Sequence, residues 1–386
     1  MDLEQLGFPL TEEHLAVHAM ARQFAHERLR PGAAERDRTG AYPTELVAEL
    51  AELGLLAMKT DPDDGGSGLD HIGYALAMQG VAEGCTSVAV ILASSNLATS
   101  ILSAHGTEAQ RQRWLGPYAS GALGPASFAL SEPHCGSDAA ALRTTARRQG
   151  DTYHLDGSKM WITSGAHAGL HIVFAKTDPD AGPRGISCFV VERGTPGLEI
   201  GREEDKMGQR ASGTVALHFD DCRIDVENRI GAEGDGYRIA LSTLGSGRVG
   251  MAGLCLGIAE YALQLGLDYA TERIAFGRRV ADFQNSRFVL ADTRLELDAA
   301  WLLTLRGAVL LDRGDRAASA SSMAKLAASE ALGRTVDRMV QLHGGYGYSR
   351  EYAIERLYRD ARVARVYEGS SEIQRLVIAR ELVNTR

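Results

Sequence analysis

The run Ile186-Ser187-Cys188-Phe189-Val190-Val191 is a short apolar stretch that decides how the chain is divided. Turn residues bound it on both sides, at 180–183 and 193–196. A run of this length between turns is typical of a buried β-strand. Residues 171–174 have the same character, and residues 215–219 alternate between apolar and polar. These runs predict an antiparallel β-domain of barrel or sandwich type over residues 124–232.

The segments on both sides of this region have helical periodicity instead. Before it, apolar residues from Val17 to Phe24 share one helix face, and Thr107 with Gln110 forms a capping box. After it, an apolar stripe runs from Met251 to Tyr269, and further helices are expected near 285–312, 316–343 and 371–384. We therefore predict an α+β multidomain chain with an N-terminal all-α domain (1–123), the central β-domain (124–232) and a C-terminal four-helix-bundle domain (233–386).

The composition is that of a soluble globular protein, with 45% apolar and 24% charged residues. The net charge is -9 and no basic stripe is present, which argues against nucleic acid as a partner. The longest apolar stretch, 87–93, is too short to cross a membrane. The acidic residues 1–5 do not resemble a signal, so a cytoplasmic protein is expected. Five scattered cysteines without metal-ligand spacing predict free thiols and no metal.

Three segments contain residues that could carry chemistry. Residues 130–138 are rich in hydroxyls and turn formers, and in 159–165 Trp161 and Thr163 could flank a planar ring system. In 367–375, Ser371 and Gln374 have capping-box spacing, which places Glu368 in the turn before a helix, where it can project into a cleft. Taken singly, the three segments are better explained as an ordinary β-turn, a core tryptophan and a solvated turn glutamate, respectively.

Taken together, the segments belong to five motifs that occur in one known order. They are Ser131-Glu132-Pro133 with Gly136-Ser137-Asp138; Trp161-Ile162-Thr163; 272–277 with Phe283-Gln284; 341–347; and Arg359-Asp360-Ala361 followed by 367–375. In these motifs the chain resembles the acyl-CoA dehydrogenases over nearly its whole length. The resemblance implies a helical, β, helical architecture and FAD as the cofactor.

The resemblance also implies roles for individual residues toward FAD. The expected contacts to the ring system are Phe128, Leu130, Ser131, Ser137, Trp161, Thr163 and Ser370, where Ser370 replaces the family's usual threonine. The expected contacts to the pyrophosphate and adenosine are Arg273, Phe276 and Gln284. Gln341, Gly344 and Gly345 match a segment that, in the family, reaches FAD held mainly by a neighbouring subunit. A homotetramer or dimer follows from that shared site.

The implied reaction is α,β-dehydrogenation of an acyl thioester. Glu368 would remove the α-proton while the flavin accepts the β-hydrogen as hydride, and the backbone N–H at Glu368 would polarise the thioester carbonyl. Ser137, Arg248 and Gly369 are the expected substrate-side residues. Some relatives carry the base just before the arginine of the long helix. Here that stretch, 245–248, has no carboxylate, so Glu368 is the only credible base.

The stretch 245–250 also matches the GxGxxG pattern of dinucleotide-binding loops. A Rossmann motif would need a strand before it, whereas the residues around it favour an unbroken helix through Asp268. We therefore do not expect a dinucleotide site at this position.

Two departures from the family's pattern lie where the thioester arm of the substrate is expected. Gly245 replaces a common aspartate, and His134-Cys135 replaces a small pair. The handle could therefore be CoA or an acyl or peptidyl carrier protein. The expected electron acceptor is an electron-transferring flavoprotein. The alternatives are a flavin-dependent oxidase that uses oxygen, and a catalytically silent helical scaffold that binds other proteins.

Overall fold

The computed structural model describes residues 6–384, so the acidic residues 1–5, on which the expectation about a signal rests, lie outside the described part. The N-terminal region is helical, as predicted. Thr11 caps its first helix, and the predicted capping box of Thr107 and Gln110 opens the last. The helices are α1 (Glu12–Phe24), a π-helical turn (Ala25–Leu29), α2 (Ala33–Thr39), α3 (Thr44–Glu52), α4 (His71–Ala82), α5 (Thr86–His105) and α6 (Glu108–Ala119).

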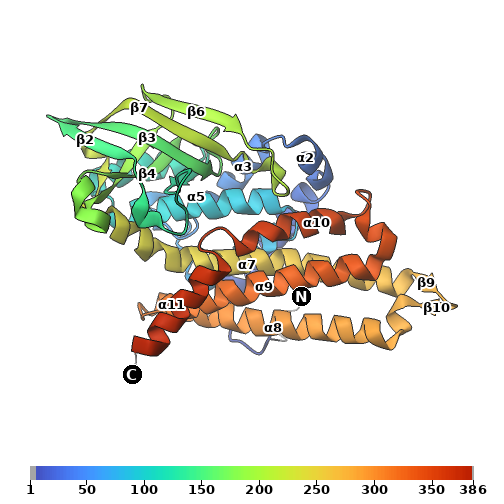
Figure 1. The fold of residues 1–386 in the computed structure, drawn as a ribbon. Coiled ribbons are helices and arrows are strands. Elements are labelled where there is room, and N and C mark those ends of the chain that lie inside the picture. The colour runs from blue at the N-terminus through green and yellow to red at the C-terminus, as the bar shows by residue number, and fades with distance from the viewer. Residues whose placement is uncertain (1–5, 385–386) are drawn as a thin grey trace.

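The central region forms one eight-stranded sheet with the order β6-β7-β3-β2-β4-β5-β8, and β1 pairs with β4. Figure 1 shows the sheet lying over α5, on one side of the long C-terminal helices. The strands are β1 (Ala126–Ala129), β2 (Thr145–Gln149), β3 (Thr152–Ile162), β4 (Leu170–Lys176), β5 (Ile186–Glu192), β6 (Leu198–Glu203), β7 (Val215–Asp225) and β8 (Arg229–Ile230).

The sheet differs from the prediction in two ways. It is not a closed barrel, because the terminal strands β6 and β8 have no pairing with each other among the described residues. It is also not purely antiparallel, because β4 runs parallel to β1 and to β2. Periodicity within a strand predicts which side chains are buried, but strand direction depends on the connections, which leave no local signal.

Strands β4 and β5 are buried on both faces, which explains the unbroken apolar run at 186–191. In β5, Cys188 and Val190 join the main core with the helices, whereas Phe189 and Val191 join a second core enclosed by the curved sheet. A strand buried on both faces does not alternate in polarity. The sheet is therefore fixed against the helical scaffold on one side and holds its own core on the other.

The C-terminal region is the predicted helical domain. Its helices α7 (Gly236–Glu272), α8 (Gln284–Asp312), α9 (Ala318–His343) and α11 (Ser371–Asn384) match the expected ranges closely, and α10 (Ala353–Ala361) was not predicted. A two-stranded hairpin, β9 (Ile274–Ala275) and β10 (Arg278–Arg279), joins α7 to α8 at the end of the bundle away from the sheet (Figure 1). The predicted domain boundaries fall between α6 and β1 and between β8 and α7.

Helix α7 is continuous through the GxGxxG stretch, as expected. Two glycines further along the same helix, Gly253 and Gly257, allow close packing. A Cβ on Gly253 would lie 2.3 Å from the carbonyl oxygen of Ala75, and one on Gly257 would lie 2.2 Å from that of Gln79. Both carbonyls belong to α4. The glycines therefore let the backbones of α4 and α7 touch.

Two helices, α5 and α7, are long and apolar enough to cross a membrane by length and composition alone. This differs from the sequence estimate, which counted only residues 87–93. In each helix 78% of the apolar window is buried inside the fold, as in the core helices of soluble proteins.

Candidate active site

Trp161 is presented at the surface by an irregularity near the end of β3. The pairing of β3 with β7 shifts register between Lys159 and Ile162, and Trp161 has a left-handed backbone with φ 65°. A non-glycine residue in this region is strained, and a bulge re-aims a side chain. The result is an indole that is 59% exposed. Such a large uncovered aromatic surface is suited to packing against a planar ligand.

A buried ion pair joins this strand to the loop that follows β1. The ammonium of Lys159 lies 2.7 Å from Oε1 of Glu132, and both side chains are almost fully buried. The backbone N–H of Met160 also donates to the carbonyl of Ser131 at 2.9 Å. Burial raises the cost of the Glu132 charge, and the Lys159 ammonium nevertheless holds the pKa of Glu132 below its usual value. Ser131 and Trp161 are therefore fixed beside each other.

Glu132, His134 and Cys135 also place three potential metal-ligand atoms within 4.8 Å of one another. However, the Glu132 carboxylate already accepts hydrogen bonds from Lys159, from the backbone N–H of Arg143 and from both donors of Thr144. A cation here would have to displace an ammonium. The geometry thus favours a structural role for the carboxylate.

Glu368 lies in the turn before α11, as predicted, and the turn has an unusual backbone. Glu368 has φ 50° and Gly369 has φ 86°, so two consecutive residues adopt left-handed conformations. Gln374 stabilises them from the first turn of α11, since its side-chain amide donates to the carbonyls of Glu368 at 3.2 Å and Gly369 at 3.0 Å. Strain that is held in place in this way is typical of functional sites.

The helix start is one residue earlier than the predicted capping box. Helix α11 begins at Ser371, and the hydroxyl that accepts from the N–H of Ile373 belongs to Ser370. Ser371 instead donates to Glu330. Gln374 keeps a capping function, but toward the carbonyls of the turn.

The carboxylate of Glu368 is enclosed and lacks a hydrogen-bond partner. Its Oε2 atom is buried and has no partner among residues 6–384. Burial raises the pKa of Glu368 to about 7, against the opposing pull of Lys325 and Arg248. Arg248 is 7% exposed, and its Nε is likewise without a partner in the described chain. Two opposite charges thus face one space with part of their bonding capacity unused.

Helix α7 leaves room for this carboxylate through Gly247. A Cβ at this position would lie 2.9 Å from Oε2 of Glu368 and 3.3 Å from a methyl carbon of Leu97. The absence of a side chain at Gly247 therefore gives the Glu368 carboxylate its place between α5, α7 and the turn.

A chain of hydrogen bonds connects Glu368 with the segment around Thr163. The N–H of Ser164 donates to the carbonyl of Ser212 at 3.1 Å, and the Ser212 hydroxyl donates to the carbonyl of Gln209 at 2.8 Å. The Gln209 amide donates in turn to the hydroxyl of Tyr367 at 3.1 Å. The β-domain and the bundle thus hold the two sides of the site together.

The second group of predicted cofactor residues lies at the other end of the bundle. Arg273, Gly344 and Gly345 line a groove of about 600 Å³ together with Tyr269 and His343, which stack on each other. A Cβ on either glycine would meet nothing within 4 Å, so their backbone is open to a ligand. Phe276, in the nearby hairpin, is 96% exposed, and Gln284 and Gln341 are exposed on the helix ends next to the groove. The predicted residues therefore form two separate groups in one chain.

Both groups suit the parts of FAD that the resemblance assigns to them. An exposed indole beside hydroxyl-bearing segments fits a flat ring system, and a guanidinium beside open backbone and stacked aromatic rings fits a pyrophosphate with its adenosine. Ser137 is exposed in the loop after β1, and Phe128, Leu130, Ser131 and Thr163 are partly buried around Trp161.

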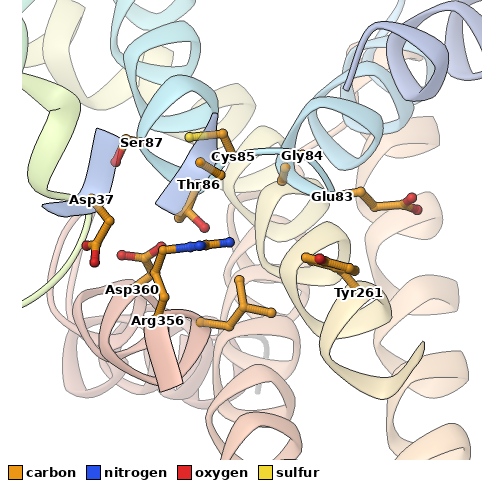
Figure 2. Close-up of a pocket in the computed structure, with 12 residues that line it drawn as sticks. Asp37, Glu83, Gly84, Cys85, Thr86, Ser87, Tyr261, Arg356 and Asp360 are labelled. Carbon is orange, nitrogen blue, oxygen red and sulfur yellow. The ribbon is translucent and has the colours of Figure 1, made fainter. Parts of the chain in front are cut away.

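A further small cavity lies between the N-terminal helices and α10 (Figure 2). Asp37, Glu83, Tyr261, Arg356 and Asp360 line it, and its volume of about 10 Å³ admits roughly one water molecule. It cannot hold an acyl group or a flavin. Burial raises the pKa of Asp360 in its wall to about 6.

Sequence reasoning missed the roles of three residues that shape the site, namely Lys159, Gln209 and Lys325, and it gave Gln374 a different capping role. Lys325 is fully buried on α9 and donates to the carbonyl of Gly369 at 2.8 Å. A signal for it exists in the sequence, because it is the one long charged side chain in the Ala- and Ser-rich run 317–329. Charge in such a run indicates a buried polar contact.

The fold and the site define a class: a flavoenzyme in which a helical scaffold and a sheet hold a buried carboxylate near a ring-binding edge. Family models agree over almost the whole chain. The acyl-CoA dehydrogenase N-terminal domain matches residues 11–122, the middle domain 127–222 and the C-terminal domain 234–383. The chain belongs to the acyl-CoA dehydrogenase family. It is accordingly an FAD-dependent oxidoreductase that acts on the CH–CH bond of acyl-CoA.

Curated relatives are similar over nearly their full length. The mitochondrial short-chain specific acyl-CoA dehydrogenase of Rattus norvegicus is 45% identical over 97% of this chain and 91% of its own. An acyl-CoA dehydrogenase of Bacillus subtilis is 41% identical, over 97% and 99%.

Three solved structures have nearly the same fold. Butyryl-CoA dehydrogenase from Megasphaera elsdenii matches with a TM-score of 0.95 and 38% identity, over 97% of this chain and 99% of its own. A chain in a structure of the electron-transferring flavoprotein of Acidaminococcus fermentans has the same TM-score and coverage at 39% identity. The prolyl acyl carrier protein oxidase AnaB matches at 0.93 and 31%, over 97% and 100%.

Proposed function

We propose that Glu368 is the base that removes the α-proton of a short-chain acyl-CoA. The observation that carries this proposal is an enclosed carboxylate oxygen without a partner, on a strained turn, with the pKa of Glu368 near 7. A base works best when its pKa is close to the working pH. The low polarity around it strengthens every charge interaction during proton transfer.

The same turn can polarise the thioester carbonyl. The backbone N–H of Glu368 makes no hydrogen bond within residues 6–384, because the left-handed turn directs it away from the preceding helical segment. A free N–H next to the base can donate to the carbonyl oxygen as negative charge develops there. Arg248 adds a buried positive charge on the substrate side.

The cofactor, when bound, takes up the β-hydrogen as hydride. Trp161, Thr163, Ser131, Ser137, Phe128, Leu130 and Ser370 would hold its ring system. The protein's part is to enclose the acyl group, exclude water and hold Glu368 toward the α-carbon.

The size class rests on the relatives. The short-chain specific and butyryl-CoA dehydrogenases share 38–45% of this sequence over nearly full length, and a short acyl group suits a base that is tightly enclosed. The electron acceptor we propose is an electron-transferring flavoprotein, in line with the match to the Acidaminococcus fermentans structure. Buried long helices and five buried free cysteines support a soluble, cytoplasmic enzyme.

A second candidate is oxidation of an acyl group on a carrier protein. The likeness to AnaB and the replacements at Gly245 and His134-Cys135 favour it. The deciding experiment mixes the FAD-loaded protein anaerobically with acyl-CoAs of four to sixteen carbons, and with butyryl and prolyl groups on a carrier protein. We expect rapid flavin bleaching by the four-carbon CoA ester and little by the others. Bleaching by carrier-bound groups alone would overturn the proposed substrate.

The same assay identifies the acceptor. Reoxidation of the bleached protein by an electron-transferring flavoprotein should be much faster than by air. Faster reoxidation by oxygen, with release of hydrogen peroxide, would make the protein an oxidase. A protein that cannot be loaded with FAD would support the silent scaffold.

We also propose that two or more copies complete each cofactor site. The expected ring-binding residues near Trp161 belong to the β-domain, whereas the groove around Arg273 lies next to the hairpin β9–β10, which is at the end of the bundle away from the sheet (Figure 1). Helix α8 in addition exposes Phe288, Leu295 and Leu302 at seven-residue intervals. An apolar stripe of this kind is typical of a helix–helix contact between subunits.

A further inference from the structure

Lys325 is a buried cation to which the proposed reaction assigns no role. It lies on α9 with no exposed surface, between buried small residues such as Ala324 and Ala328. The small neighbours let α7 and α9 pack closely around its long side chain. Burying an ammonium costs several kcal/mol unless other groups compensate it, so its partners indicate its purpose.

Those partners converge on the turn that carries the base. The ammonium of Lys325 donates to the carbonyl of Gly369 at 2.8 Å. The carboxylates that interact with it are Glu368, Glu330 and Glu372, of which Glu372 is exposed and also interacts with Arg375. Glu330 is already bonded to Ser371 and lies near Arg365 and Arg375. Glu368 is thus the carboxylate without another cation bonded to it.

The other groups around Glu368 cannot replace Lys325. Tyr74 on α4, Cys255 on α7 and the adjacent Tyr367 are all neutral at working pH, because burial raises the pKa of each. Arg248 on α7 is positive, but it forms no ion pair within the described chain and makes no bond to the turn. Lys325 alone combines a positive charge with a hydrogen bond to the turn.

We propose that Lys325 is a positioning residue for the reaction: its ammonium fixes the Gly369 peptide and, facing Glu368, favours the ionised form of the base. This inference rests on the proposed role of Glu368. Lys325 touches neither the substrate nor the flavin and acts through the carboxylate and its turn. The neutral side chain of Gln374 donates to the carbonyls of Glu368 and Gly369. Gln374 therefore also fixes the Gly369 peptide, but it does not favour the ionised form of Glu368.

The test compares Lys325→Met with Lys325→Arg in the FAD-loaded protein, with Lys206→Met as a control. Burial lowers the pKa of both Lys325 and Lys206, but Lys206 bonds to Ser212 and Thr214 in the β-domain. The first readout is the pH profile of anaerobic flavin reduction by butyryl-CoA. The second is an infrared titration of the Glu368 carboxyl without substrate, assigned by subtraction of Glu368→Gln.

We expect the acidic limb of the Lys325→Met profile to move to higher pH by about one unit or more. Its rate should fall about fivefold or more at pH 7 and recover at higher pH, and the infrared titration should move equally. Lys325→Arg should lie near the wild type, and Lys206→Met should not shift. A Lys325→Met profile with unchanged pH dependence and uniformly lower rates would overturn the proposal.

Two further measures keep the outcome decisive. If Lys325→Met does not fold, Lys325→Gln retains a donor to Gly369 without the charge and should show the same shift. If the wild type reduces no flavin with any thioester, the proposed function fails. The infrared titration would then still show whether Lys325 controls the protonation of Glu368.

Discussion

The turn that carries Glu368 and the groove around Arg273 differ in almost every physical property, although the family relationship assigns both to one cofactor. The turn is partly buried, strained and held by Gln374 and Lys325 of its own chain. The groove is open, and its glycine backbone faces empty space. The difference supports the proposal that one chain completes the chemistry, whereas the binding of the cofactor also needs a neighbouring copy.

The largest effect that separates the turn from the groove is expected when the base alone is removed. Glu368→Gln should lower the rate of flavin reduction by about 10²–10⁴-fold, because an amide cannot accept the α-proton. FAD content should stay at the wild-type level, since the groove is untouched. Stopped-flow bleaching with butyryl-CoA measures the rate, and the flavin-to-protein absorbance ratio measures the content. An undiminished rate would remove Glu368 from its role.

The ion pair of Glu132 and Lys159 beside Trp161 tests how rigid the end of β3 is. The end of β3 could be held as firmly as the turn of Glu368, or it could be as open as the groove around Arg273. Lys159→Met leaves the Glu132 charge buried without its cation and should cost about 3–5 kcal/mol of unfolding free energy. Denaturant unfolding of the FAD-loaded protein measures this loss. Arg38→Met, which removes an exposed pair with Glu35, is the matched control and should leave stability unchanged. Equal stability of both variants would show that the end of β3 is not a rigid part of the core.

Glu368 itself should make the closed region less stable at high pH. Its pKa rises from an ordinary 4.5 to about 7 on folding, so the folded state binds the proton more tightly than the unfolded state. This group's contribution therefore falls between about pH 4.5 and 7, by on the order of 3 kcal/mol at about 1.4 kcal/mol per pKa unit.

Glu368→Gln avoids this cost and should unfold later than the wild type at pH 8, but not at pH 4.5. Thermal unfolding at both pH values checks the difference. A gain of the same size at both pH values would argue against a buried titrating carboxylate.

The smallest expected effect concerns the groove. Arg273→Ala should weaken FAD binding about 10–100-fold through loss of charge-assisted hydrogen bonds, while flavin reduction in the FAD-saturated protein stays near normal. Fluorescence titration of the apoprotein with FAD gives the affinity.

Co-expression of two chains, one with Arg273→Ala and the other with Glu368→Gln, tests directly whether the cofactor site is shared. If the site is shared, one chain's intact Glu368 can work with the other's intact Arg273, and mixed oligomers recover activity at limiting FAD. No recovery would mean that each chain binds its cofactor alone.

Much of the helical architecture could be predicted because it depends on local periodicity. The ranges of α8, α9 and α11 follow from it, and Glu368 was placed in its turn because the capping-box spacing of Ser371 and Gln374 marks a helix start. The same local signal was wrong by one residue at the cap, since Ser370 and Ser371 are equivalent in sequence.

Contacts over long sequence separations could not be predicted. Lys325 and Gly369 are 44 residues apart, and Glu132 and Lys159 are 27 apart. Their meeting depends on how helices and strands pack. For the same reason the sequence did not reveal that the sheet stays open, whereas the family resemblance already implied a cofactor site shared between subunits.

The separation of these two groups has a consequence for how the enzyme is made. On the proposal that two or more copies complete each cofactor site, a newly folded chain by itself holds only part of that site, and FAD would promote the association of copies. When FAD is scarce, cells would then accumulate single chains rather than assembled enzyme without cofactor. Dilution would release FAD and separate the subunits in the same step.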